Sequence, residues 1–136
     1  MPDKILNEIE ELVGTDDFEY EAEMKMEQLE ETGAGIEAVT PLLQIMERHP
    51  LDDFGAPGPL VQFAERFYKN GYEEKLIESL KRRPAVHTLL MLNRIINGSD
   101  SKDEYIALLK EVSERADIEE EIKNSAQEFI DYQNSK

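Results

Sequence analysis

Apolar residues recur at intervals of three and four along almost the whole chain, and this spacing predicts helices. Gly, Pro or a polar cluster ends each apolar pattern after a few turns. No stretch alternates apolar and polar residues for long enough to predict a strand. We therefore expect an all-α fold in a single domain, residues 1–136. About eight short helices are expected, at residues 3–13, 16–31, 36–48, 59–70, 72–83, 84–97 and 101–116, and from 117 onward.

Several positions refine the helix starts. Pro41 lies inside the third expected helix, so that helix either starts late, with Pro41 in its first turn, or is kinked. Ser101 with Glu104, and Asp117 with Glu120, fit capping boxes for the last two helices.

The turns between the expected helices are short, which favours antiparallel neighbours. Two arrangements fit: stacked helical hairpins of the HEAT or armadillo kind, or a compact irregular bundle. A spacing of roughly 35 residues per pair is in the range of helical repeats, although no repeated motif accompanies it. The expected pairs are residues 17–48, 58–82 and 84–116.

The length and composition suit a folded domain. The chain has 136 residues, 40% of them hydrophobic, which is enough to bury one core. No apolar run is long enough to cross a bilayer, and the N-terminal residues lack the apolar stretch of a signal peptide. There is no cysteine, so no disulfide framework indicates export. We expect a cytoplasmic protein.

The net charge is −16, and it is unevenly distributed. Residues 1–55 carry a net charge of −13, residues 56–99 carry +3, and residues 100–136 carry −6. Direct binding to nucleic acid or to an anionic membrane is not expected, because both would repel this surface. A basic protein would be attracted. The alternative is that the charge only maintains solubility.

The second expected helix concentrates the negative charge. Tyr20 and Met24 point away from its apolar side and lie among carboxylates, a composition typical of contact surfaces. Alternatively, the first helix covers both side chains. The carboxylates of this candidate surface are Asp16 and Asp17 at the helix start and a stripe at helical spacing, Glu19, Glu23, Glu27 and Glu30.

The segment 49–59 is the least regular part of the chain, with three prolines and two glycines between His49 and Pro59. Asp52, Asp53 and Phe54 lie within it and form a second candidate contact patch, since loops of this kind often carry binding residues. Phe54 could instead fold back onto the core.

The residues of known catalytic and metal sites are not arranged in their usual patterns. Neither His49 nor His87 has a second potential ligand at metal-site spacing, and no Gly-rich loop combines with a lysine to bind phosphate. Carboxylate pairs are abundant but fall mostly on faces expected to be exposed, where their pKa values would not be tuned for catalysis. We expect no enzyme activity, no metal and no cofactor. An enzyme using a carboxylate pair would need acids buried in a polar pocket.

The middle of the chain resembles small all-helical immunity proteins of bacterial contact-dependent and other polymorphic toxin systems. The resemblance covers about 40 residues and implies a cytoplasmic protein that binds the C-terminal domain of a toxin, often a nuclease. It implies no catalytic residues. The segments that carry it are Pro57-Gly58-Pro59-Leu60-Val61-Gln62-Phe63 through Tyr72-Glu73-Glu74, Glu78-Ser79-Leu80-Lys81-Arg82-Arg83-Pro84, and His87-Thr88-Leu89-Leu90-Met91-Leu92-Asn93-Arg94-Ile95-Ile96-Asn97-Gly98.

Charge and resemblance lead to one hypothesis. A nuclease presents a basic cleft to its substrate, and an acidic inhibitor can occupy that cleft or its rim. We therefore expect an immunity protein or antitoxin that binds a basic toxin domain, an RNase or DNase, in a stoichiometric complex. The alternative is a helical-repeat adaptor for another protein or peptide. The oligomeric state does not follow from the sequence.

Overall fold

The computed structural model describes residues 2–55, 57–100 and 102–135, and the described residues form helices and connecting turns without a strand. The all-α prediction is confirmed. The helices are α1 (Pro2–Leu12), α2 (Phe18–Glu31), α3 (Val39–Arg48), α4 (Pro59–Glu65), α5 (Tyr72–Arg82), α6 (Val86–Asn97), α7 (Lys102–Ser113) and α8 (Glu120–Asn134), with a short 3₁₀ turn η1 (Ile36–Ala38) before α3.

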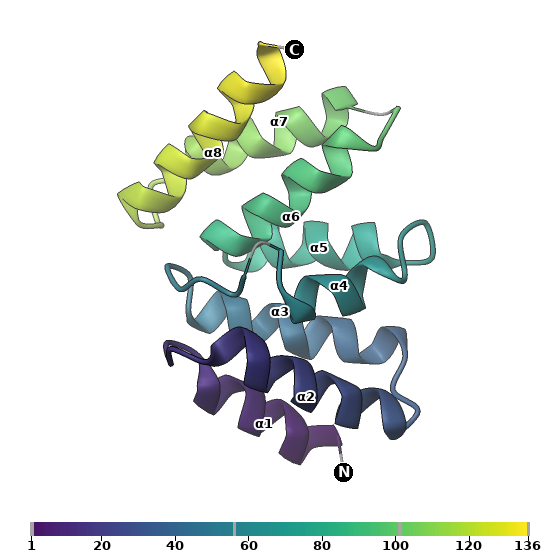
Figure 1. The fold of residues 1–136 in the computed structure, drawn as a ribbon. Coiled ribbons are helices and arrows are strands. Elements are labelled where there is room, and N and C mark those ends of the chain that lie inside the picture. The colour runs from purple at the N-terminus through teal and green to yellow at the C-terminus, as the bar shows by residue number, and fades with distance from the viewer. Residues whose placement is uncertain (1, 56, 101, 136) are drawn as a thin grey trace.

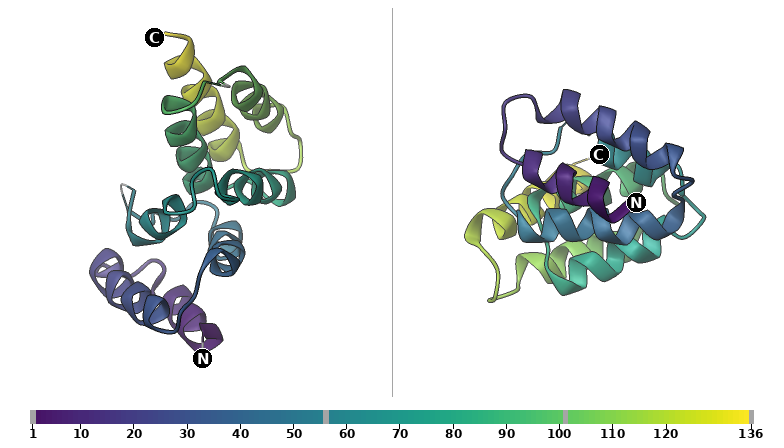
Figure 2. Two further views of the ribbon diagram at one scale, coloured as in Figure 1. Left: turned by 90° about the vertical axis from the view of Figure 1, so that its right-hand side faces the viewer. Right: turned by 90° about the horizontal axis from the view of Figure 1, so that it is seen from below.

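The helices are stacked from the N-terminal to the C-terminal end, with the two termini at opposite ends of the molecule (Figure 1). Seen from the side, α2 and α4 lie in one column and α1, α3 and α5 in the other (Figure 2). The packing agrees with this view, because α3 contacts α1 and α5, while α2 contacts α4 and α6 contacts α8. The arrangement is a stack of helical pairs.

Two of the three expected pairs, residues 17–48 and 58–82, are not the main helix contacts of the structure, whereas α6 and α7, the expected pair at residues 84–116, pack against each other as extensively as α5 and α6 do. Between consecutive helices, α1 packs against α2, α3 less extensively against α4, α5 against α6, and α7 most extensively against α8. The prediction placed the long 49–58 segment between two pairs, whereas in the structure it joins α3 to α4 within one pair. The lengths of the turns do not determine which helices pair, because every helix is short enough to pack against either the preceding or the following helix.

The core runs through the stack, and α6 is its centre. Eight of the twelve α6 residues are buried, as expected from its apolar circumference. Pro41 lies in the first turn of α3, which starts after η1 and therefore needs no kink. Pro59 is at the start of α4, where its missing N–H costs nothing. However, α4 ends at Glu65, before the expected end at residue 70.

The expected caps are only partly observed. Asp17 is the N-cap residue of α2, but its side chain makes no capping hydrogen bond. The Asp117 prediction is wrong: Glu119 is the N-cap residue of α8, and the Asp117 carboxylate instead accepts two hydrogen bonds from Arg115, at 2.9 and 2.7 Å. A bidentate pair with arginine is stronger than a single bond to a backbone N–H. Ser101 lies outside the described residues.

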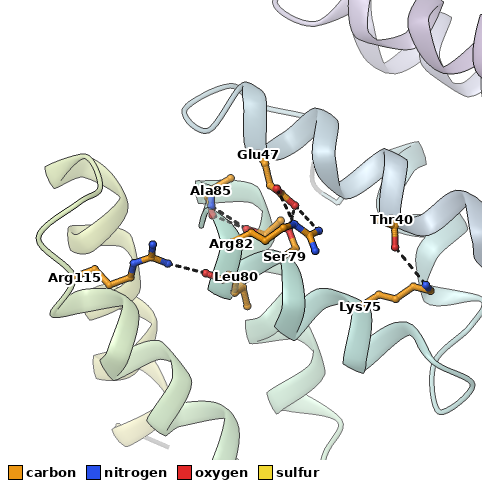
Figure 3. A network of polar contacts seen from close by, with 9 residues as sticks. Thr40, Glu47, Lys75, Ser79, Leu80, Arg82, Ala85 and Arg115 are labelled. Atoms are coloured by element: carbon orange, nitrogen blue, oxygen red, sulfur yellow. Dashed lines mark hydrogen bonds and ion pairs between the residues drawn. The ribbon is translucent and has the colours of Figure 1, made fainter.

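A buried acid links α3 to α5 (Figure 3). The Glu47 carboxylate accepts a hydrogen bond of 2.7 Å from the Ser79 hydroxyl and two from the Arg82 guanidinium, at 3.2 and 2.8 Å. Since Glu47 is buried, these donors offset the loss of its hydration. This network of hydrogen bonds fixes the position of α3 relative to α5.

A candidate acidic protein-binding surface

The 49–58 loop is docked against the start of α6. The backbone N–H of Val86 donates to the carbonyl oxygen of Pro50 at 2.9 Å, and Nε2 of His87 lies 2.9 Å from the carbonyl oxygen of Pro57. A carbonyl can only accept, so the His87 proton is on Nε2. Burial lowers the pKa of His87, which therefore stays neutral at pH 7. Both ends of the loop are thus anchored to the core.

Phe54 is the central anchor of this loop. Its exposed fraction is 0%, and its ring packs edge-on against the rings of Phe18 and His87, with centroid distances of 5.5 and 5.3 Å. Phe54 therefore offers no surface to a partner, and its assignment to the contact patch is wrong. In the structure Phe54 is folded onto the core, as the alternative prediction stated.

The backbone beside Phe54 requires glycine. Gly58 has φ of 93°, and a Cβ at this position would collide with the carbonyl oxygen of Phe54. A residue without Cβ is the only one that fits both the angle and the contact. The loop is therefore held closely against itself as well as against the core.

This docking brings the two predicted acidic patches together. The α1–α2 turn and the 49–58 loop lie on the same side of the stack (Figure 1) and form a hollow of about 490 Å³, which we call the acidic hollow. Its walls are separated by more than 30 positions in the sequence. The lining residues are Gly14, Thr15, Asp16, Asp17, Phe18, Glu19, Tyr20, Asp52, Asp53 and Gly55.

The five acids of the hollow differ in their bonding. Asp53 accepts the backbone N–H of Gly55 at 2.9 Å, and Asp52 lies 3.6 Å from Nδ1 of His49. Within the described ranges, no side-chain hydrogen bond or ion pair involves Asp16, Asp17 or Glu19. These three carboxylates are exposed and available to a cationic partner.

The acidic stripe continues from the hollow along α2. Glu23, Glu27 and Glu30 line a second hollow of about 280 Å³ against α4, which we call the α2–α4 groove. Glu30 is half-buried and pairs at 2.9 Å with Arg66, the residue that follows α4. This ion pair stabilises the contact between the two helices. Glu30 was predicted as a free contact residue, and this prediction is wrong. Glu23 and Glu27 are exposed.

Tyr20 and Met24 are not covered by the first helix. Their exposed fractions are 70% and 48%, among the highest of the large hydrophobic side chains. The first helix packs against α2 elsewhere, where Lys25 pairs with Glu8 at 3.4 Å. A tyrosine at the rim of the hollow and a methionine one turn further therefore lie beside unneutralised carboxylates.

The basic side chains next to the 49–58 loop are already paired. Arg48 donates to both oxygens of Glu10, at 2.8 and 2.6 Å, and Nε2 of His49 lies 2.9 Å from Glu10. The hydrogen bond from Arg48 is the main cause that lowers the pKa of Glu10. These residues lie 38 and 39 positions apart in the sequence, and no sequence pattern joins them.

Gly14 and Thr15, which also line the acidic hollow, were not predicted as site residues, although a Gly-Thr-Asp-Asp turn is a recognisable loop signal.

Two further observations concern the described part of the chain. None of its helices combines the length and apolarity needed to cross a membrane. No group of three or more His, Asp or Glu side chains comes together there as potential ligands of a metal ion. Comparison of the chain with protein-family models, with curated proteins and with solved structures found no match.

Proposed function

We propose that this protein is an immunity protein that binds and neutralises a basic toxin domain, an RNase or DNase, in a stoichiometric complex. The observation that carries the proposal is the meeting of two acidic segments in one hollow, beside an exposed tyrosine and methionine. The resemblance of residues 57–98 to helical immunity proteins supports the same function. The producing cell would hold the complex in its cytoplasm.

The chemistry of the hollow suits lysine and arginine side chains. Asp16, Asp17 and Glu19 provide negative charge that no base among the described residues neutralises, and Tyr20 provides an aromatic face for a cation–π contact. A basic cleft that binds the phosphates of RNA or DNA has complementary chemistry. Opposite charges also accelerate association, which an inhibitor of a toxic enzyme requires.

The test is binding to the toxin domain encoded beside this gene. Calorimetry at low and high salt would measure stoichiometry and affinity, and nuclease activity would be read in the same mixtures. We expect one-to-one binding that weakens with salt and abolishes nuclease activity. Absence of binding, or binding without inhibition, would contradict the proposal.

A helical-repeat adaptor is the second candidate. The stacked helical pairs and the exposed side chains of Tyr20, Met24 and Leu51 favour it. Such an adaptor would bind its partner mainly through apolar contacts. Its affinity would change little between low and high salt, so the same calorimetric series separates the two functions.

A further inference from the structure

A further recess lies between α5 and α7, far along the chain from the acidic hollow. Both helices pack against α6, so they form two ridges on the same support. Two hollows of about 370 and 360 Å³ lie between these ridges and share Lys81, Leu108 and Glu111. Because the hollows share three residues, they are adjacent, and we call the two together the α5–α7 groove.

The floor and walls of the α5–α7 groove are largely apolar. Leu80, Leu108 and Val112 are buried at its base, and Ile77 and Tyr105 are half-buried along its walls. The two hollows follow α7 from residue 104 to residue 115, so they succeed one another along the helix axis. The recess therefore offers two successive apolar positions, about one to two helical turns apart at 5.4 Å per turn.

The rim of the α5–α7 groove is negatively charged. Glu104, Glu111 and Glu114 line it, and no ion pair involves them within the described residues. Of the two bases at the rim, Arg115 is neutralised by Asp117, with nitrogen–oxygen distances of 2.9 and 2.7 Å. Lys81 provides the remaining positive charge.

Further acids lie at the Tyr105 end of the groove. Burial is the main cause that raises the pKa of Tyr105, and the charges of Glu73 and Glu104 raise it further. The end formed by Tyr105 is therefore the more acidic one.

The other end of the groove is fixed by Arg115. Its Nη1 donates to the carbonyl oxygen of Leu80 at 3.1 Å (Figure 3) and to that of Lys81 at 3.2 Å. These carbonyls belong to the last turn of α5, where the helix dipole favours a cation. Arg115, two positions beyond the end of α7, thus holds the two ridges at a defined separation, and the recess is preformed.

We propose that the α5–α7 groove binds an amphipathic helix of a partner protein, whose apolar side chains fill the two hollows and whose lysine or arginine side chains contact the acidic rim. An apolar recess between two helices accepts a third helix through residues spaced three, four or seven apart. The charge of the rim selects a basic helix over an acidic one. This surface is separate from the acidic hollow, and the inference does not rest on the proposed function.

The probe is a synthetic amphipathic peptide of about 18 residues, with leucine at helical positions i, i+4 and i+7 and lysine on both flanks. Its binding to the full chain would be followed by fluorescence anisotropy, and its site would be mapped by amide chemical shifts. We expect the largest shifts at residues 77–81 and 104–115. Ala107→Arg and Glu111→Lys should each weaken binding at least about tenfold. Both positions are exposed, so neither change should unfold the protein.

Two controls separate groove binding from general attraction to an acidic protein. Glu128→Lys makes the same charge change as Glu111→Lys at an exposed position of α8, and should leave the affinity unchanged. Asp16→Lys with Glu19→Lys alters the acidic hollow and should also leave it unchanged. Absence of measurable binding, equal binding of a scrambled peptide of the same composition, or equal loss with Glu128→Lys would each overturn the proposal.

Discussion

The ring of Phe54 packs edge-on against the ring of Phe18, with 5.5 Å between the ring centroids. Phe18 is the first residue of α2, and Phe54 belongs to the loop between α3 and α4. The two rings connect the segment that carries Asp16 and Asp17 to the segment that carries Asp52 and Asp53, and all four acids line the acidic hollow. A buried apolar pair thus determines where the exposed acids meet.

Replacing Phe54 should destabilise the fold far more than replacing an exposed neighbour. Phe54→Ala removes a fully buried ring, and we expect a loss of about 3–5 kcal/mol in the free energy of unfolding. Leu51→Ala, in the same loop but 49% exposed, is the control and should stay within about 0.5 kcal/mol of wild type. Urea denaturation would measure both. Similar losses in the two variants would show that Phe54 is not an anchor.

Gly58 and Gly33 form a matched pair for testing the loop backbone. Both have positive φ, at 93° and 83°, but a Cβ on Gly33 meets nothing within 4 Å, whereas one on Gly58 meets the carbonyl group of Phe54. Gly33→Ala should cost about 1–2 kcal/mol, the cost of the left-handed conformation alone. Gly58→Ala should cost clearly more, because the loop must also move. The free energies of unfolding of the two variants give the comparison, and equal values would contradict the observed loop geometry.

The contact between α3 and α5 should depend on Glu47. Glu47→Ala leaves the Ser79 hydroxyl and the Arg82 guanidinium without their acceptor, at a cost of about 1–3 kcal/mol. The cost is limited because the Arg82 side chain remains 39% exposed and can be hydrated. Glu31→Ala, an exposed change on α2, is the control. If both variants have the same thermal midpoint, the network does not contribute to stability.

The pair formed by Glu10 and Arg48 should make stability depend on acid. The pKa of Glu10 is lowered from its ordinary value of 4.5, chiefly by the hydrogen bond from Arg48. As the pH falls below about 4.5, the unfolded chain binds this proton before the folded protein does. The stabilisation is therefore present above that pH and is lost as the pH falls through the lowered pKa.

Glu10→Gln isolates this effect. At pH 6 the variant should be less stable than wild type by about 1 kcal/mol, and by pH 3 the difference should shrink. Urea midpoints of both proteins at the two pH values would test the sign. A difference that stays constant with pH would mean that the charge of Glu10 contributes nothing.

Under the proposed function, charge reversal in the acidic hollow should slow association with the proposed toxin domain. Asp16→Lys combined with Glu19→Lys should lower the association rate about tenfold at low salt, with a smaller effect on dissociation. Glu121→Lys with Glu128→Lys on α8 makes an equal change in net charge and is the control. Stopped-flow fluorescence would measure the rates. Equal slowing in both variants would assign the effect to net charge rather than to the hollow.

The sequence by itself determined the local structure. Apolar residues three and four apart predicted the helices, since a helix turns every 3.6 residues, and the apolar circumference of residues 84–97 predicted their burial. The positions of Pro41 and Pro59 in first turns follow from the missing N–H of proline. The stripe of glutamates on α2 is also a local property.

Only the tertiary structure decided how these parts meet. The pairing of α1 with α2, the capture of Glu30 by Arg66 and of Asp117 by Arg115, and the joining of two acidic segments in one hollow were not predicted. For Phe54 the sequence left two positions open, and the structure has the buried one. The spacing of apolar residues indicates which side of a helix is apolar, but it does not indicate which neighbouring helix covers that side. That choice depends on the packing of side chains distant in the sequence, and the ion pairs and the hollow follow from it.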